Sequence, residues 1–306
     1  MVRVGPRYTF LYQKKYRIYR QMKKVDNLVR DIYQCIDDGS DIHDEDMAWF
    51  LDFMKSELIT FLDVDERKER KPSIRMSNIG RDNRKLWYDF HHPIPYKLAP
   101  EQRIKFFYGH MLEAFLLLMC KIAGHDVRDM QREVYLNGIT GHIDAIIDDV
   151  VVDVKSASTF GFRKFDRAEL FTNDPFGYIA QISGYIQAID NEDTDSMERG
   201  AFLAIDKTHG KLAFLPIEEM DTIDASKRID ELRAIVNTNS EPDRCHDVIT
   251  EDNGNLRLCT DCNWCDHKHR CWSDSNKGSG LRTFKYSTGY KYFTHIEKEP
   301  RVEELL

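Results

Sequence analysis

The sequence has no hydrophobic segment long enough to cross a membrane. Its longest apolar run, Ala114 to Cys120, falls far short of the about 20 residues that a membrane-spanning helix needs. The N-terminus also lacks the apolar core and the small-residue cleavage site of a secretory signal peptide. These absences predict a soluble, cytoplasmic protein without a membrane partner, located in the host cytoplasm if a phage encodes it.

The chain also lacks a basic excess. Its 306 residues carry 44 Lys and Arg against 52 Asp and Glu, a formal net charge of −8. This acidity argues against a general nucleic-acid binder, because such proteins usually show a basic balance. Both signs alternate and 42% of the residues are hydrophobic, which predicts a globular protein with a sizeable core and excludes a disordered, collagen-like or coiled-coil chain.

Basic residues and cysteines are unevenly distributed along the chain. Between Met1 and Arg30 the basic residues face a single acid, Asp26, so this segment is either a solvated helix face or an arm that contacts DNA. Most of the seven cysteines lie between Cys245 and Cys271. In a chain without a secretion signal, such crowding indicates metal binding and not disulfides.

Hydrophobic periodicity predicts an α/β core with a helical region before it. A helix is expected from Pro100 to Ala123, and a second helix is expected to open at Asp174 and Pro175. Strands are expected over 132–136, 141–147 and 150–156, with a hairpin over 201–216. The predicted divisions are a helical N-terminal region (1–72, basic at its start), the core (73–217), a helix with the cysteine segment (218–272), and a linker and tail (273–306).

A strand–turn–strand segment around Asp148 and Asp149 carries the strongest functional signal. If these two residues form a two-residue turn, cross-strand partners have numbers that sum to 297, which places Asp144 opposite Asp153. Side chains alternate along a strand, so Lys155 joins Asp153 on the same face. The register predicts a cluster of two carboxylates and one lysine.

Two carboxylates opposite each other repel, and an apolar hairpin needs compensation to place them there. A divalent cation supplies it, and oxygen-only ligands favour magnesium or manganese, which activate water and stabilise a phosphoryl transition state. Lys155, with His142 expected opposite it, is placed to orient a nucleophile or to neutralise developing charge. The alternative is a surface hairpin whose charged side chains are only solvated.

Three further polar residues fit such a site. Glu113 interrupts the apolar run Met111 to Met119, where an unpaired carboxylate is costly, so it is either a third metal ligand or exposed on the polar helix face. Gln181 and Tyr185 are four residues apart and project from one helical face. Tyr185 also fits the apolar stripe of its helix.

Four short motifs occur in the order found in the PD-(D/E)XK nuclease superfamily, and the chain resembles its RecB-like branch. They are G-x-x-x-E over 109–113, G-x-x-D over 141–144, D-x-K over 153–155 and Q-x-x-x-Y over 181–185. Glu113 stands where many members have histidine and where the lambda exonuclease type has glutamate. The resemblance covers roughly residues 75–216 and implies a central mixed β-sheet flanked by helices, the restriction-endonuclease-like core.

The resemblance implies metal-dependent hydrolysis of DNA phosphodiester bonds. Its ligands for one or two Mg²⁺ or Mn²⁺ ions would be Glu113, Asp144, Asp153 and the Val154 carbonyl. Lys155 would position or activate water, and Gln181 and Tyr185 would steady the site and the DNA strand.

The segment from 77 to 88 resembles the one that precedes the main helix in phage-encoded and CRISPR-associated relatives of this branch. Its Ser77 belongs to the expected DNA-binding set, and its Arg81, Arg84 and Lys85 are expected phosphate contacts. The DNA partner is expected to be linear or to present single-stranded ends. Protein partners are not indicated by the sequence.

The cysteine segment contains C-x2-C-x5-C over 262–271, which resembles the iron–sulfur motif at the C-terminal end of the same branch. That branch takes a fourth cysteine from upstream, where this chain has Asp82 and Asn83. Adding Cys259 gives C-x2-C-x2-C-x5-C, and the proposed ligands of a [4Fe–4S] cluster are Cys259, Cys262, Cys265 and Cys271. Zn²⁺ on these thiolates, or on a mixture with Cys245 or neighbouring histidines, is the alternative.

The sequence therefore predicts a PD-(D/E)XK deoxyribonuclease, most simply an exonuclease of recombination, repair or phage DNA processing, with a metal-stapled C-terminal segment. An endonuclease of the same superfamily has the same catalytic residues and differs in substrate access. A non-catalytic DNA-binding module with a structural metal site is the alternative from another class.

Overall fold

The structure, a computed structural model, describes residues 23–63, 71–94, 99–192 and 199–305. The chain forms two compact units. Of the described residues, unit 1 comprises 23–63, 74–80, 99–192 and 199–229, and unit 2 comprises 71–73, 81–94 and 230–305. Most of the basic N-terminal segment, residues 1–22, lies outside the described residues.

Unit 1 is built on a mixed sheet with the strand order β1-β4-β5-β6-β7. The strands are β1 (Val127–Arg128), β4 (Ala145–Ile147), β5 (Val150–Ala157), β6 (Gly200–Asp206) and β7 (Leu212–Ile217). The β5–β6 pair is parallel and the other pairs are antiparallel. A parallel pair needs a long crossover, and here the crossover carries α6 (Thr159–Asp166), the 3₁₀ helix η4 (Glu169–Phe171) and α7 (Tyr178–Glu192).

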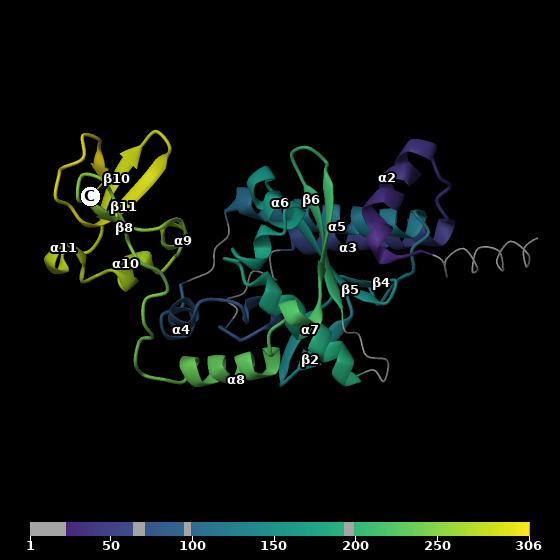
Figure 1. The fold of residues 1–306 in the computed structure, drawn as a ribbon, viewed down its shortest axis with the longest axis horizontal. Coiled ribbons are helices and arrows are strands. Elements are labelled where there is room, and N and C mark those ends of the chain that lie inside the picture. Colours follow the sequence, from purple (N-terminus) through teal and green to yellow (C-terminus); the bar gives the residue numbers. More distant parts are fainter. Residues whose placement is uncertain (1–22, 64–70, 95–98, 193–198, 306) are drawn as a thin grey trace, which may run out of the picture. The chain divides into compact units, whose positions relative to one another are not determined.

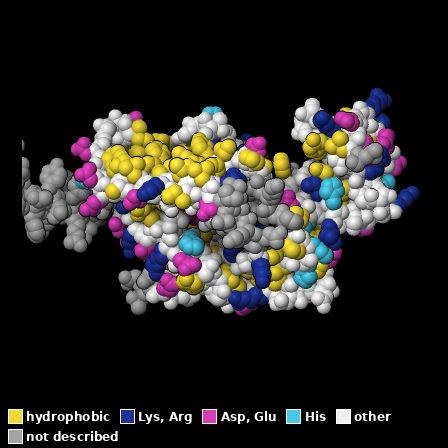
Figure 2. Space-filling view, turned by 180° about the vertical axis from the view of Figure 1, so that it is seen from behind, with side chains coloured by type: hydrophobic (Ala, Val, Ile, Leu, Met, Phe, Trp, Pro, Cys, Tyr) yellow, Lys and Arg dark blue, Asp and Glu magenta, His cyan; other side chains and the backbone are white. Residues whose placement is uncertain are grey.

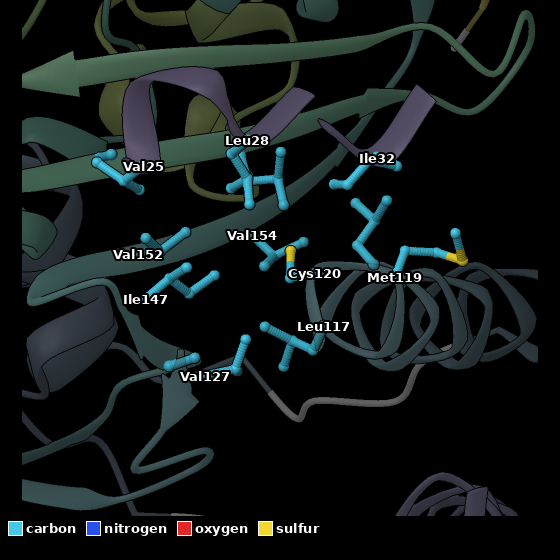
Figure 3. Packing of buried hydrophobic residues seen from close by; sticks show 14 of the residues in the cluster. Val25, Leu28, Ile32, Leu117, Met119, Cys120, Val127, Ile147, Val152 and Val154 are labelled. Atoms are coloured by element: carbon cyan, nitrogen blue, oxygen red, sulfur yellow. The ribbon is translucent and has the colours of Figure 1, made fainter. Parts of the chain in front are cut away.

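One face of this sheet is covered by α2 (Leu28–Asp38) and α5 (Pro100–Ile122), and α3 (Asp44–Leu62) packs along α5. Figure 3 shows Leu28 and Cys120 meeting Val154 in the hydrophobic core between these helices and the sheet. The sequence places the start of α5 correctly at Pro100, whose missing N–H costs nothing at a first helical position.

The opposite face of the sheet is covered by α6 and α7. Phe202 of β6 contacts the rings of Phe165 in α6 and Tyr178 in α7, with centroids 5.6 and 6.1 Å apart. Since side chains alternate along β5, Val154 faces α2 and α5, whereas Asp153, the neighbour of Phe202 in the register, faces α6 and α7.

The predicted hairpin around Asp148 and Asp149 is confirmed. Both residues have positive φ, 47° and 65°, as a two-residue type I′ turn requires. Ala145 pairs with Val152, so the paired residue numbers sum to 297 as predicted.

The strand predicted over 141–147 is wrong, because the chain divides it between two sheets. Its first part belongs to β3 (Ile139–His142), which pairs with β2 (Glu133–Leu136). His142 lies opposite Glu133 and not opposite Lys155. The physical reason is local: Asp144 Oδ2, not a main-chain oxygen, accepts the Val154 N–H at 2.6 Å, so the β4–β5 ladder ends before residue 144.

The helix expected to open at Asp174 and Pro175 begins later, at Tyr178. The Asp174 carboxylate still caps it, because Oδ1 and Oδ2 accept the N–H groups of Tyr178 and Ile179 at 3.0 and 2.8 Å. Gly177, with φ of 72°, turns the chain between this cap and the helix.

Unit 2 contains α4 (Asn83–His91), the second part of α8 (Ala225–Val236), and a five-stranded antiparallel sheet. Its strand order is β12-β10-β11-β9-β8. The strands are β8 (Ile249–Thr250), β9 (Leu256–Arg257), β10 (Arg282–Tyr286), β11 (Gly289–His295) and β12 (Glu304–Leu305). Three short helices lie between β9 and β10 in sequence: α9 (Thr260–Asn263), α10 (Lys268–Cys271) and α11 (Ser275–Gly278). The segment expected to be a linker and tail therefore supplies three of the five strands.

The α/β class, the central mixed sheet flanked by helices and the helical N-terminal region are confirmed. Within the described residues, no helix is long and apolar enough to cross a membrane.

Candidate metal and nucleic-acid site

The four residues of the predicted catalytic cluster come from three elements of unit 1. Asp153 and Lys155 lie on β5, Asp144 lies just before β4, and Glu113 lies on α5. The hairpin turn fixes the first three, since it sets the register of β4 against β5. The charges of Asp144 and Asp153 act on Glu113, so the structure brings all three carboxylates into one electrostatic cluster.

Asp144 is half-buried and close to a second carboxylate. Burial raises its pKa to about 7, and the charge of Asp153 raises it further, against the opposing effects of Lys155 and the Val154 N–H. In the absence of a cation, this carboxyl is therefore partly protonated near neutral pH, unlike an ordinary aspartate.

Glu113 has the larger shift of the two. Burial and then the charges of Asp144 and Asp153 raise its pKa to about 9, with Lys155 opposing them. The side-chain amide of Gln131 donates to Glu113 Oε1 at 2.5 Å. Glu113 is half-buried, and the charges of Asp144 and Asp153 act on it, which favours the metal-ligand alternative over a fully exposed residue.

Lys155 is the one cation that acts on all three of these acids. Its Nζ forms an ion pair with Asp153 Oδ2 and lies 4.7 Å from the centroid of the Tyr178 ring. Burial by itself lowers the pKa of this lysine, but the charges of Asp153 and Asp144 outweigh burial and raise it. The lysine therefore stays protonated and acts as a hydrogen-bond donor.

Gln181 and Tyr185 lie on α7 beside this cluster, as predicted. The Gln181 amide donates to the Tyr185 hydroxyl oxygen at 2.9 Å. Burial and the charge of Asp153 raise the pKa of Tyr185, so its hydroxyl is neutral and remains a donor. The pair thus presents one hydroxyl proton toward the acids.

Two motif glycines are required by packing. A Cβ at Gly141 would lie 2.6 Å from Met76 Cβ and 2.7 Å from Tyr185 Cε1, and a Cβ at Gly184 would lie 2.3 Å from Met76 Sδ. Any side chain at these positions would displace Tyr185 or the segment that carries Met76. The glycines of the G-x-x-D and Q-x-x-x-Y motifs therefore allow the site to close.

The donor set fits a hard divalent cation. Three carboxylates and the Val154 carbonyl offer oxygen only, as Mg²⁺ and Mn²⁺ prefer. Asp153 Oδ2 is buried, and its partner among the described residues is the ammonium group of Lys155. A cation would satisfy this oxygen and reduce the repulsion that raises the pKa of Glu113 and Asp144.

The predicted DNA-binding residues are divided between the two units. Ser77, in the 3₁₀ helix η3 (Met76–Asn78) of unit 1, is exposed. Arg81 belongs to unit 2 and pairs with Asp89 at 3.0 Å. Lys85 is half-buried, and its charge acts on the thiol of Cys265.

Arg84 has a structural role that the sequence did not reveal. Its side chain is 12% exposed and pairs with Glu241 at 2.6 Å. It also donates to the Pro242 carbonyl oxygen at 2.5 Å and to the Tyr88 hydroxyl at 3.2 Å. These contacts fix the 241–242 segment to α4, a role that the sequence did not indicate for Arg84.

The cysteines of unit 2 gather around Cys262. Burial, then the neighbouring thiol of Cys259, and then Cys265 and Cys271 raise its pKa. All seven cysteines are free thiols. Among the described residues no three of the cysteine Sγ atoms lie within 4.8 Å of one another, so the thiols of unit 2 are neighbours through their electrostatic effects and not through a closed ligand geometry.

Cys245 extends this thiol cluster toward α4. Burial and the charge of Asp82 raise its pKa, whereas the main-chain N–H groups of Lys85 and Arg84 donate to it. Cys245 therefore lies at the N-terminus of α4, beside Asp82. The charge of Cys271 also raises the pKa of Cys245.

One further group of potential ligands lies in the same unit. The ligand atoms of His246, Cys259 and Asp261 all lie within 4.8 Å of one another, the one such group of three found in the described part of the chain. His267 is not part of it, because its Nε2 contacts Asp89 Oδ1 at 2.8 Å and its ring stacks on Tyr88.

Two contributors to the carboxylate site were missed by sequence reasoning. Gln131 holds Glu113 from a loop without a recognisable pattern. Tyr178, whose ring centroid lies 4.7 Å from Lys155 Nζ, precedes Gln181 by one helical turn, and this spacing was the available signal.

Comparisons with known proteins do not extend these observations. No family model matches the sequence, and no curated protein matches it significantly. A solved structure described as the crystal structure of SSO0001 matches with a TM-score of 0.38 and 18% identity, over 70% of this chain and 92% of that chain. A similarity at this level carries no argument about function.

Proposed function

We propose that this protein is a metal-dependent deoxyribonuclease of the PD-(D/E)XK type that hydrolyses phosphodiester bonds at DNA strand ends. One observation carries the proposal: three carboxylates, Glu113, Asp144 and Asp153, converge around the protonated Lys155. Strongly raised pKa values of buried acids are concentrated at functional sites, and a divalent cation is the partner that would compensate three neighbouring carboxylates.

Glu113, Asp144, Asp153 and the Val154 carbonyl would hold one or two Mg²⁺ or Mn²⁺ ions. When bound, the metal supplies Lewis-acid stabilisation of the phosphoryl oxygens and lowers the pKa of water. The pKa values of Glu113 and Asp144 require protons to leave as the metal binds. Metal affinity should therefore increase with pH.

The remaining groups position the substrate. Lys155 donates hydrogen bonds, and the Tyr178 ring restricts where its Nζ can point, so the lysine is arranged to orient water or a non-bridging phosphate oxygen. The Gln181–Tyr185 pair offers a neutral hydroxyl donor from the next turns of α7. Together these groups favour hydrolysis over binding alone.

In unit 2, the thiols would hold a [4Fe–4S] cluster, with Zn²⁺ as the alternative, in a structural role. In the four-thiolate arrangements, Cys262, Cys265 and Cys271 are joined by either Cys259 or Cys245, whereas a zinc site can also include a histidine such as His246. Iron and zinc analysis of the single Ser variants at 259 and 245 distinguishes them, because the variant that lacks a ligand loses metal and the other retains it.

The experiment that tests the proposed activity is digestion of end-labelled linear DNA beside covalently closed circles, with Mg²⁺ or Mn²⁺ and with EDTA. Loss of linear DNA alone supports an exonuclease, and nicking of circles supports the endonuclease alternative. Asp153→Asn is the matched inactive control. Metal-loaded wild-type protein that cuts neither substrate would refute the proposed function and leave the DNA-binding module.

A further inference from the structure

Phe176 presents an aromatic ring to solvent next to the carboxylate cluster. The residue is 63% exposed, yet its ring stacks on Tyr178 with centroids 5.3 Å apart. Tyr178 in turn lies over Lys155 Nζ, and Lys155 pairs with Asp153. The Tyr178 ring therefore lies between the exposed Phe176 ring and Lys155.

The segment that carries this ring is held rigidly. Gly177 adopts a φ of 72° and packs backbone to backbone against Gly80, so closely that a Cβ on Gly177 would lie 2.4 Å from Gly80 Cα. The buried Lys164 donates to the main-chain and side-chain oxygens of Asn173 at 2.9 and 3.1 Å. Asp174 caps α7. The exposed ring is thus fixed in place, as a preorganised contact surface requires.

We propose that Phe176 is a stacking platform for a nucleobase of single-stranded DNA whose phosphate lies at the carboxylate cluster. This inference rests on the proposed function and names its substrate class. A base inside a duplex has both faces covered by its neighbours, whereas an unpaired base can place one face on an aromatic ring. The inner face of the Phe176 ring is occupied by Tyr178, so a base would stack on the outer face.

The test uses a single-stranded oligonucleotide with 2-aminopurine near its end, in Ca²⁺ to limit cleavage. The fluorescence of 2-aminopurine falls when it stacks on an aromatic ring. We expect quenching by the wild-type protein and by Phe176→Trp, and loss of quenching with affinity lowered roughly 5- to 150-fold in Phe176→Ala. Met220→Ala is the matched control, because Met220 is an exposed apolar residue of the same unit at 89%.

Two results would overturn the inference: equal quenching by wild type and Phe176→Ala, or no quenching by wild type at any label position. Hydrolysis of bis(p-nitrophenyl) phosphate with Mn²⁺ separates this outcome from failure of the proposed function, because that substrate has no nucleobase. If neither wild type nor Phe176→Ala hydrolyses this phosphodiester or DNA, the proposed activity fails. If the wild type nevertheless quenches the fluorescence and Phe176→Ala does not, the stacking platform is supported.

A different observation carries a second inference, which does not depend on the activity. The helices α3 and α5 each present a stripe of large apolar side chains to solvent, and Figure 2 shows hydrophobic side chains gathered in a band on this face. In α3, no described residue is fully buried. The eight residues of the stripes are 36–62% exposed: Leu51, Leu58, Ile59, Leu62, Ile104, Tyr108, Met111 and Phe115.

The two stripes form one surface because the helices run antiparallel in contact. Phe61 near the end of α3 packs on Phe107 near the start of α5, with ring centroids 4.9 Å apart. At the other end, Lys121 of α5 pairs with Asp46 of α3 at 3.0 Å. If each of the eight side chains offers about 200 Å² when fully accessible, their exposed parts amount to roughly 800 Å².

We infer that a second copy of this chain covers the α3–α5 face. An area of ~800 Å² per partner is that of a standard stable interface, and it exceeds the largest apolar patch of ~300–600 Å² on a typical monomer. Two antiparallel helices are also half of a four-helix bundle, which a two-fold axis completes with the same surface on both partners.

Sedimentation equilibrium of the full chain between about 1 and 100 μM tests the dimer. Wild type should be dimeric, and Leu58→Asp should shift it to monomer at the same concentration, because the two-fold axis would bury two unpaired charges. Met220→Asp, an exposed site away from α3 and α5, should leave the dimer unchanged, and circular dichroism confirms folding. A monomeric wild type, or a dimer that Leu58→Asp leaves intact, would overturn the inference.

Discussion

Replacing Asp144 by Asn should stabilise the metal-free protein while it abolishes the metal site. The substitution removes a charge from a cluster of three carboxylates and keeps the side-chain shape. The amide oxygen can still accept the Val154 N–H, which Asp144 Oδ2 accepts at 2.6 Å. The change therefore tests the repulsion with little disturbance of the local structure.

The magnitude follows from the pKa of Asp144, which burial and then Asp153 raise from 3.8 to about 7. A folded-state pKa above the unfolded value means that ionisation disfavours the folded state. The cost is absent below about pH 4, grows as pH rises to 7 and is constant above it. About three pKa units at ~1.4 kcal/mol each set an upper bound of ~4 kcal/mol on the stabilisation by Asp144→Asn at pH 8.

Urea unfolding in EDTA at pH 8 and pH 4 measures this free energy. Asp144→Asn should be more stable than wild type by about 1–4 kcal/mol at pH 8, and the difference should vanish near pH 4. Excess Mg²⁺ should stabilise the wild type at pH 8 and leave the variant unchanged. A variant that is no more stable than wild type at pH 8 would contradict the cost of ionising Asp144 that burial and then Asp153 impose.

Three other predictions concern different parts of the chain. Lys155→Met should lower DNA cleavage by about 100-fold or more in an end-labelled assay while Mg²⁺ still stabilises the protein; an undiminished rate would exclude Lys155 from the reaction. Gly177→Ala should cost roughly 2 kcal/mol or more in urea unfolding, and more than Gly210→Ala, which shares the positive φ but has no atom within 4 Å; equal costs would contradict the close packing against Gly80. Wild-type protein purified without oxygen should absorb near 400 nm, roughly where thiolate-bound iron–sulfur clusters do, and Cys262→Ser should lose this absorption; colourless protein that contains zinc would select the alternative metal.

The centre of the carboxylate site was predictable because the hairpin is a local structure. The turn at Asp148 and Asp149 sets the register by itself, and the alternation of side chains then places Asp153 and Lys155 on one face. The main helix was equally local, since Pro100 marks its start. The interactions that decide these features are between residues near in sequence.

The features that sequence reasoning missed depend on contacts between distant segments. The break after His142 is the exception, because it is a local effect that periodicity does not reveal: the Asp144 side chain accepts the Val154 N–H. Arg84 was predicted to be a phosphate contact. The structure adds an ion pair with Glu241, a residue far away in sequence. The strands after residue 280 were also missed. They are short, and hydrophobic periodicity does not identify the strands with which they pair.

The most direct test of the central claim is anomalous diffraction from crystals of the protein soaked in Mn²⁺ near pH 8. The account predicts an anomalous peak bounded by carboxylate oxygens of Glu113, Asp144 and Asp153, and no such peak in Asp144→Asn. Density for manganese elsewhere, with these three carboxylates free of metal, would contradict it.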